Sequence, residues 1–443
     1  MPLAYFFQFM QSVKRLVYTS ALFLLLGLHI CAQQVIDVDE VTAESTSSTT
    51  DLQQSSASPT TSVTHAQTIA NRVRALLRNP LFNHSQVGLC VYDLTDDSLI
   101  YAYHPHYRLR PASNAKVITA VTALDLLGPD YKYRTTMLSD YAPDTLYTRL
   151  NDSVFQECIY LAGNLYVHGG FDPLLGSQEI DQFIAALKQR GISEIRGNIV
   201  LDTSLKDENR LGWGWCWDDN DPPLVSLLYN GKDDFASAFF SRLYAAGIKL
   251  GGKMIGGYAP DSAYVVCQIE RNMADIMRPM MKNSDNLFAE SMFYQLAAHG
   301  GTRGATRKEA AAVIDSLVAR LGLDYSIYEF ADGSGLSLYN YASPWLLLTL
   351  LRHAYANPAI YNALLPTLPI AGVDGTLSNR MQNTSAAGNV YAKTGTVTGV
   401  STLSGYCTAS NGHRLAFAIM NNGLRNAASG REFQDRVCVA LCK

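Results

Sequence analysis

A serine and a lysine three residues apart lie at the start of an apolar segment, "RPASNAKVITAVTALDLLG". On a helix such residues share a face, so Ser113 and Lys116 are expected to be neighbours. A lysine amine can remove the proton of a serine hydroxyl if burial or a nearby positive charge keeps the amine neutral. The pair indicates acyl transfer through a serine, although Ser-x-x-Lys also arises by chance in a chain of this length.

A second polar group occurs in "MMKNSDNLFAE", between two helical stretches. Ser284, Asp285 and Asn286 are all good helix N-caps, which is the simpler interpretation of the segment taken alone. A tight loop at the same place can also project these side chains into a cleft.

The third group occurs in "YAKTGTVTG", where the pattern predicts a strand. Alternation places Lys393 and Gly395 on one face of that strand, and Thr394 and Thr396 on the other. A glycine inside a strand often marks the close approach of a ligand or another backbone. An ammonium and two hydroxyls gathered there suit a substrate carboxylate.

In this order, Ser-x-x-Lys, Ser-Asp-Asn and Lys-Thr-Gly form the signature set of penicillin-binding proteins and serine β-lactamases. Further segments narrow the resemblance, namely "RPASNAKVITA", "ADGSGLSLYNYASP", "LPIAGVDGTLSNRM" and "AKTGTVTGVSTLSGY". They closely resemble the D-alanyl-D-alanine carboxypeptidase/endopeptidase family, the low-molecular-mass class C penicillin-binding proteins. The resemblance covers roughly residues 67 to 443.

The resemblance implies roles for the first two motifs. Ser113 would be the acylated nucleophile and Lys116 its general base. Ser284 would relay a proton to the departing amine, and Asn286 would hydrogen-bond the peptide backbone of the substrate. The reaction would need no cofactor and no metal, because water is the final acyl acceptor.

The resemblance also implies roles for the third motif. Lys393 would keep Lys116 neutral through its positive charge. The strand segment Lys393, Thr394, Gly395 and Thr396 would bind the terminal carboxylate of the substrate. The oxyanion hole would consist of the backbone N–H groups of Ser113 and Thr396.

The implied fold is an α/β (α+β) fold of the penicilloyl-serine transferase, or β-lactamase-like, type, with an antiparallel sheet flanked by helices. Strand patterns in "NVYAKTG", "STLSGYCTA" and "HRLAFAIMN", followed by a helical pattern, agree with it. Residues 67–138 and 262–443 would form the catalytic domain. Residues 139–261 would form an inserted α/β domain between the first two motifs.

The N-terminus has the pattern of an export signal. Lys14 and Arg15 precede a short apolar run that ends near "CAQQ", which predicts a signal peptide over residues 1–32 and a periplasmic protein. A lipid anchor at Cys31 and a retained anchor helix are the alternatives. Residues 41 to 65 contain 14 Ser or Thr, so residues 33–66 are expected to be a flexible tether.

Composition excludes several other classes of function. The net charge is −4 without a run of Lys or Arg, which argues against binding of nucleic acid. The nine His residues form no HExxH motif and no Cys/His quartet, so no metal site is expected. The cysteines that follow residue 32 form no CxxC pair, and we expect no disulfide framework.

The predicted activity is cleavage of peptidoglycan peptides that end in D-Ala-D-Ala, or of D-Ala cross-links, with β-lactam antibiotics as inhibitors. A serine β-lactamase and a DD-transpeptidase remain alternatives because they use the same three motifs. A catalytically inactive wall-binding protein is the alternative outside enzymes, and it is disfavoured because all the polar residues of the motifs are intact.

Overall fold

The structure is a computed structural model that describes residues 64–443 except 152 and 220. The signal peptide expected over 1–32, and the tether as far as residue 63, lie outside the described residues. Helix α2 (His65–Leu76) begins two residues before the expected boundary at 67. Its start is fixed by a capping box, because Thr64 and Gln67 each accept a hydrogen bond from the other's backbone N–H. No helix in the described part of the chain is long and apolar enough to cross a membrane.

The sheet that carries the Lys-Thr-Gly segment has five strands in the order β12-β13-β14-β1-β2, and every neighbouring pair is antiparallel. Its strands are β1 (Gln86–Asp93), β2 (Ser98–Tyr103), β12 (Tyr391–Val397), β13 (Val400–Thr408) and β14 (Arg414–Asn422). The first two strands and the last three join where β1 pairs with β14. The antiparallel sheet expected from the sequence is therefore present.

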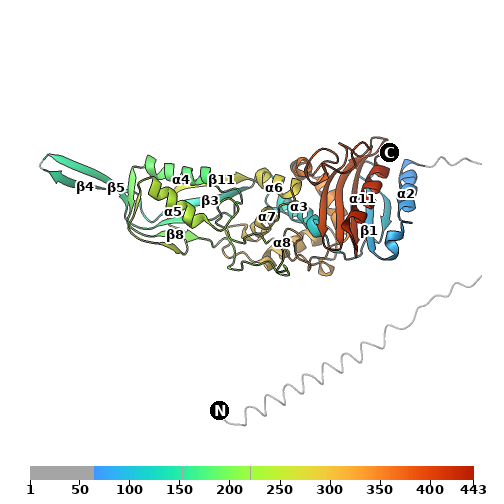
Figure 1. The fold of residues 1–443 in the computed structure, drawn as a ribbon, viewed down its shortest axis with the longest axis horizontal. Coiled ribbons are helices and arrows are strands. Elements are labelled where there is room, and N and C mark those ends of the chain that lie inside the picture. Colours follow the sequence, from blue (N-terminus) through green and yellow to red (C-terminus); the bar gives the residue numbers. More distant parts are fainter. Residues whose placement is uncertain (1–63, 152, 220) are drawn as a thin grey trace, which may run out of the picture. The chain divides into compact units, whose positions relative to one another are not determined.

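Helices cover both faces of this sheet. Leu89 and Val91 of β1 pack into an apolar cluster with α2 and α11 (Ala427–Leu441), which lie side by side in Figure 1. The alternate residues, Cys90 and Tyr92, pack into the other cluster, with α9 (Pro344–Ala356) and the helices beyond it. Because side chains alternate along a strand, this division places an apolar core on each side of the sheet.

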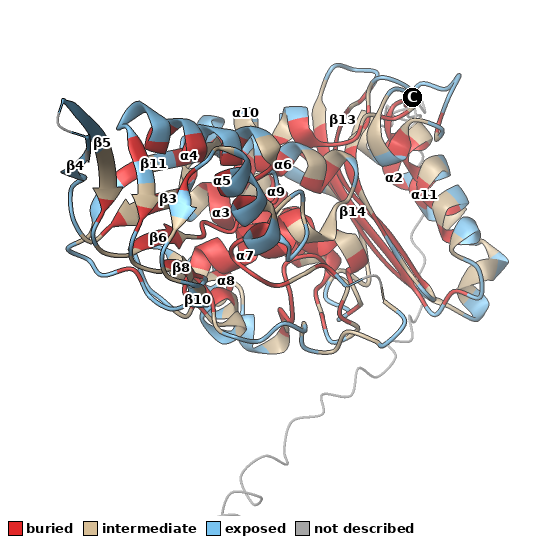
Figure 2. Cartoon of the chain, turned by 60° about the vertical axis from the view of Figure 1, so that its left-hand side comes forward, coloured by how far each residue is buried: buried red, intermediate tan, exposed pale blue. Residues whose placement is uncertain are grey.

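Helix α3 (Ala115–Leu126) occupies the centre of the second cluster. Every residue from Ala115 to Leu124 is buried, and Figure 2 shows the helix in the colour of buried residues. A helix that is apolar on all sides is stable only when other elements surround it. The helices of this group are α6 (Met273–Lys282), α7 (Asn286–Ala298), α8 (Arg307–Arg320) and α10 (Pro358–Leu364). Short 3-10 turns are η1 (Pro80–Asn83), η2 (Ala112–Asn114), η3 (Tyr325–Ile327), η4 (Leu365–Thr367) and η5 (Gly375–Leu377).

The segment between the first two motifs forms two further sheets with its own core. One has the order β10-β8-β6-β3-β11 and the other β4-β5-β7-β9, and both contain parallel pairs. The strands are β3 (Lys132–Ser139), β4 (Asp144–Asn151), β5 (Val154–Leu161), β6 (Leu165–His168), β7 (Ile192–Ile195), β8 (Ile199–Asp202), β9 (Lys249–Leu250), β10 (Met254–Gly256) and β11 (Tyr264–Asn272). Helices α4 (Ser177–Gln189) and α5 (Phe235–Ala245) pack through Phe183 and Phe239.

The first of these sheets extends past both ends of the expected insertion at 139–261. Strand β3 begins at Lys132 and β11 ends at Asn272, and the two strands pair with each other in antiparallel fashion. Strand β3, by which the chain enters this region, thus lies beside β11, by which the chain leaves it. All seven cysteines of the described residues are free.

Candidate active site

Ser113 lies in the 3-10 turn η2, directly before α3. Pro111 precedes the turn, and Ala112 has a left-handed backbone (φ 46°), which is uncommon for a residue with a side chain. The turn aims the serine at the helix that follows, and Lys116 Nζ lies 3.0 Å from Ser113 Oγ. The predicted neighbour relation of Ser113 and Lys116 is confirmed.

Lys116 is fully buried and has two further hydrogen-bond partners. Its Nζ donates to Asn286 Oδ1 at 2.8 Å and to the Ser334 carbonyl at 2.8 Å. Burial lowers the pKa of Lys116 to about 8, against the opposing charges of Asp332, Glu290 and Asp285. A lysine with this pKa carries a neutral fraction near neutral pH and can therefore act as a base.

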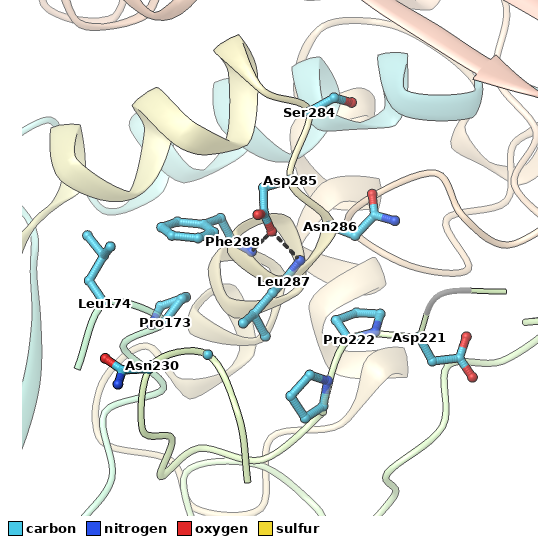
Figure 3. A pocket seen from close by; sticks show the side chains of 12 residues that line it. Pro173, Leu174, Asp221, Pro222, Asn230, Ser284, Asp285, Asn286, Leu287 and Phe288 are labelled. Atoms are coloured by element: carbon cyan, nitrogen blue, oxygen red, sulfur yellow. Dashed lines mark hydrogen bonds between the residues drawn. The ribbon is translucent and has the colours of Figure 1, made fainter. Parts of the chain in front are cut away.

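The Ser-Asp-Asn segment combines both of the interpretations weighed for it. Asp285 is the N-cap of α7, and its carboxylate accepts hydrogen bonds from the N–H groups of Leu287 (2.9 Å) and Phe288 (3.4 Å). Figure 3 shows this carboxylate turned to those N–H groups and Asn286 projecting away from it. Ser284 has a left-handed backbone (φ 62°). Asp285 thus caps the helix, while Ser284 binds Lys393 and Asn286 binds Lys116.

Lys393 completes the cluster from strand β12. It is fully buried, and its Nζ donates to Ser284 Oγ at 2.9 Å and to the Thr394 carbonyl at 2.7 Å. Burial, followed by the charge of Lys116, holds the pKa of Lys393 well below its usual range. The charge of Lys116 thus lowers the pKa of Lys393, whereas burial is the cause that lowers the pKa of Lys116.

Gly395 lies where β12 touches the turn that carries Ser113. A Cβ atom at this position would come within 2.8 Å of the Pro111 carbonyl oxygen and 3.0 Å of the Asn114 nitrogen. The close approach of another backbone, expected for a glycine in this strand, is thus observed. Thr394 Oγ1 lies 2.7 Å from Thr376 Oγ1, and Thr396 is exposed. Lys393 and Gly395 are buried while the two threonines are more accessible, in agreement with the expected alternation.

Asn114 was not singled out from the sequence. It is buried, and its amide donates to the Lys393 carbonyl at 3.2 Å and to Thr402 Oγ1 at 2.6 Å. The side chain next to Ser113 thereby fastens η2 to β12 and β13. The feature of the sequence that could have identified Asn114 is its position inside the Ser-x-x-Lys motif.

A loop at residues 332–337 supplies the third acceptor of Lys116. Asp332 shapes this loop, because its buried carboxylate accepts from the N–H groups of Gly335 (2.7 Å) and Ser337 (2.6 Å). Glu290 accepts from Ser334 N at 2.9 Å. This segment is part of the family resemblance, but the sequence indicated no role for it. A backbone carbonyl can bind a lysine whatever the side chain of its residue is.

A pocket of about 670 Å³ lies beside the Ser-Asp-Asn loop (Figure 3). The loop and the start of α7 form one wall. The segment between the first two motifs forms the rest, with Pro173, Leu174, Asp221, Pro222, Pro223, Asn230 and Gly231. Elsewhere in the described residues, Asp93, Asp96 and His413 lie close enough together that they could hold a metal ion. They belong to segments that supply none of the groups bonded to Lys116.

The arrangement thus joins a hydroxyl, a buried amine with a lowered pKa, a second hydroxyl and a second buried amine. Residues 69–226 and 223–442 match the sequence pattern of the D-Ala-D-Ala carboxypeptidase 3 (S13) family. The chain belongs to this family. The family resemblance drawn from the motifs is confirmed.

Known relatives agree with this membership. The chain is 26% identical to D-alanyl-D-alanine carboxypeptidase DacB of Haemophilus influenzae, over 80% of this chain and 89% of that protein. It is also 26% identical to the D-alanyl-D-alanine carboxypeptidase of Actinomadura sp. strain R39, over 84% of each.

Solved structures agree on the fold. Penicillin-binding protein 4 (dacB) of Haemophilus influenzae matches with a TM-score of 0.71 at 24% identity, over 83% of this chain and 98% of that one. A second structure of the same protein, complexed with a β-lactam, matches with a TM-score of 0.65 at 26% identity, over 82% and 98%. The penicilloyl-serine transferase fold expected from the motifs is confirmed.

Proposed function

We infer that the chain is a serine-type D-alanyl-D-alanine carboxypeptidase and endopeptidase that forms an acyl-serine intermediate. Its substrates would be peptidoglycan stem peptides that end in D-Ala-D-Ala, and D-Ala cross-links between stems. The observation that carries the inference is the 3.0 Å contact between Lys116 Nζ and Ser113 Oγ, inside a cluster that joins all three motifs. Membership of the D-Ala-D-Ala carboxypeptidase 3 family and the two carboxypeptidase relatives support it.

The acylation step follows from the positions of these groups. Neutral Lys116 would take the proton of Ser113 Oγ as that oxygen bonds to the carbonyl carbon of the penultimate D-Ala. The backbone N–H groups of Ser113 and Thr396 would stabilise the oxyanion. Asn286 would bind the substrate backbone in addition to Lys116.

Collapse of the tetrahedral intermediate breaks the C–N bond, and the departing amine needs a proton. Ser284 would relay to this amine the proton that Lys116 took from Ser113, and Ser284 Oγ accepts a hydrogen bond from Lys393 Nζ at 2.9 Å. Lys393, Thr394 and Thr396 would bind the terminal carboxylate, and the absence of a side chain at Gly395 lets the strand approach the nucleophile. Water then adds to the acyl-serine, which frees Ser113 and the shortened peptide.

β-Lactam antibiotics would acylate the same serine. The related penicillin-binding protein 4 of Haemophilus influenzae has been crystallised with a β-lactam, which supports this part of the proposal. Mass spectrometry after incubation with penicillin should find one adduct, on Ser113, and none in Ser113→Ala. Defined monomeric and cross-linked muropeptides should lose D-Ala or be split.

The same experiment separates the alternatives. Rapid turnover of penicillin without an adduct would favour a serine β-lactamase, and product exchange with an added amine would favour a DD-transpeptidase. If the parent protein neither carried an adduct nor cleaved muropeptides, the proposal would fail and a wall-binding protein would be preferred.

We propose further that residues 67–138 and 262–443 form the catalytic domain, and that the inserted residues 139–261 steer access of peptidoglycan. Support comes from the pocket beside Ser284, since the segment between the first two motifs forms most of its wall. Leu174→Ala with Asn230→Ala should slow cleavage of cross-linked peptidoglycan and leave penicillin acylation unchanged. Tyr244→Ala, at an exposed position of α5, is the control. Equal slowing in both variants, or none in either, contradicts the steering role.

Export to the periplasm is the last part of the proposal, with residues 1–32 as signal peptide and residues 33–66 as tether. Cleavage after Ala32 predicts that the mature chain begins at Gln33. Mass spectrometry of the N-terminal peptide from a periplasmic extract measures this. If the mature chain began instead at a lipid-modified Cys31, the protein would be anchored by a lipid and the proposed cleavage after Ala32 would be wrong.

A further inference from the structure

A buried carboxyl group lies next to the general base proposed above. Glu290 is on α7, one turn after Asn286, and is 1% exposed. Its Oε1 accepts a hydrogen bond from Ser334 N at 2.9 Å, and its Oε2 accepts one from Gly333 N at 3.3 Å. Lys116 Nζ donates to the carbonyl of the same Ser334 at 2.8 Å. One residue therefore binds Glu290 through its N–H and Lys116 through its carbonyl.

We propose that Glu290 is a positioning residue that sets the protonation of Lys116, through its negative charge and through the Ser334 backbone that both side chains bind. This inference rests on the proposed function, because it takes Lys116 as the base of acyl transfer. Glu290 itself would accept no proton from the substrate or from Ser113.

All charged groups that face Lys116 affect its protonation. Asp285 and Glu290 come from α7 and its cap, Asp332 from the 332–337 loop, and Lys393 from β12. The three acidic residues favour the ammonium form, while burial favours the neutral amine and lowers the pKa to about 8. Without the carboxylates, a buried lysine would be neutral at lower pH.

The surroundings of Glu290 act on its charge in opposite directions. Two backbone N–H groups point at its oxygens, which favours the carboxylate. Burial is the first cause that raises its pKa, to about 8, and the charge of Asp332 is the second. Burial thus raises the pKa of Glu290 and lowers the pKa of Lys116 toward the same range of pH.

Glu290→Gln tests the inference, because it removes the charge and keeps the size of the side chain. The second-order rate constant of penicillin acylation is measured against pH for the parent and the variant. The rate constant should rise with pH in both, as Lys116 loses its proton, and the midpoint of the rise should lie at lower pH in the variant. A midpoint unchanged within error, with only a lower plateau, overturns the proposal, because that result is what lost packing alone would give.

Two further variants separate charge from shape. Glu290→Asp keeps the charge, so its midpoint should stay closer to that of the parent than the midpoint of Glu290→Gln. Glu179→Gln is the matched control, since Glu179 is also buried and also accepts a backbone N–H, from Gly176, but belongs to α4. Its midpoint should equal that of the parent.

A measurement on the parent protein covers the case in which Glu290→Gln does not fold. Carbon-13 NMR of labelled glutamate carboxyl groups should show one carboxyl that titrates with the midpoint of the acylation profile. If no carboxyl responds in that range, the proposal is overturned. If penicillin does not acylate the parent at all, it is the proposed function that fails, and this outcome is distinguishable from an unshifted midpoint.

Discussion

Trp215 Nε1 donates a hydrogen bond of 2.9 Å to Asp332 Oδ2. This bond joins the segment between the first two motifs to the loop whose Ser334 carbonyl binds Lys116. A second bond runs from Ser337 Oγ to the Trp213 carbonyl at 2.8 Å. Trp213 and Trp215, in the aromatic stretch of this segment, therefore support the loop that binds Lys116.

Trp215→Phe should weaken this support. The variant keeps an aromatic ring, though a smaller one, and removes the only donor of the indole, so Asp332 keeps its bonds to the backbone of the loop and loses one from a side chain. A hydrogen bond to a charged group contributes about 1.5–3 kcal/mol. We expect the free energy of unfolding to fall by about 1–3 kcal/mol and penicillin acylation to slow several-fold, as measured by denaturant unfolding and adduct formation.

Trp217→Phe is the control for that variant. Trp217 belongs to the same stretch and is 96% exposed. Its replacement should change neither unfolding nor acylation. Equal behaviour of the two variants would show that the Trp215 bond supports nothing in the site.

The pH dependence of acylation should follow Lys116. Its pKa of about 8 is below the usual value for lysine because of burial, so the base form is the minor form below pH 8 and the major form above it. The second-order rate constant of penicillin acylation should rise about tenfold per pH unit below that value and level off above it. A rate constant independent of pH between about 6 and 9 would remove Lys116 from the role of base.

Lys116→Arg should abolish acylation. A guanidinium keeps a positive charge and can donate hydrogen bonds to the same acceptors, but it does not become neutral in a protein. Mass spectrometry should find no penicillin adduct on Ser113 in this variant, while circular dichroism reports a folded chain. Labelling at the parental rate would contradict the proposed role of the amine.

The sequence predicted those parts of the site in which side chains carry the chemistry. Ser113, Lys116, Ser284, Asn286 and Lys393 were all identified before the fold was known, because three motifs in a fixed order constrain each other. The antiparallel sheet was predictable for a similar reason, since its last strands alternate or are continuously apolar and are joined by short turns.

The remaining parts depend on long-range contacts. The Ser334 carbonyl binds Lys116 only because the 332–337 loop is folded around Asp332, and a backbone group has no identity in a sequence. Strands β3 and β11 pair with each other across the proposed limits of the insertion, although they are far apart in the sequence. Such pairing over a long distance is not visible in the local pattern of either strand.

Gly395→Ala tests whether β12 must lie against the nucleophile turn. The added Cβ would overlap Thr402 Oγ1 and would lie 2.8 Å from the Pro111 carbonyl oxygen, so the strand or the turn has to move. Overpacking of this kind typically costs about 1–3 kcal/mol. We expect a lower unfolding temperature and a large loss of penicillin acylation, because Pro111 lies two residues before Ser113.

The matched control is Gly256→Ala, at a strand glycine of β10 where an added Cβ meets no atom within 4 Å. This variant should acylate and unfold like the parent, so that a loss in Gly395→Ala reflects the site and not the loss of a strand glycine. Since both variants change one hydrogen to a methyl group, the comparison isolates the contact itself. Parental acylation in Gly395→Ala would show that the strand can retreat without disturbing Ser113, and that the close approach serves no purpose in acyl transfer.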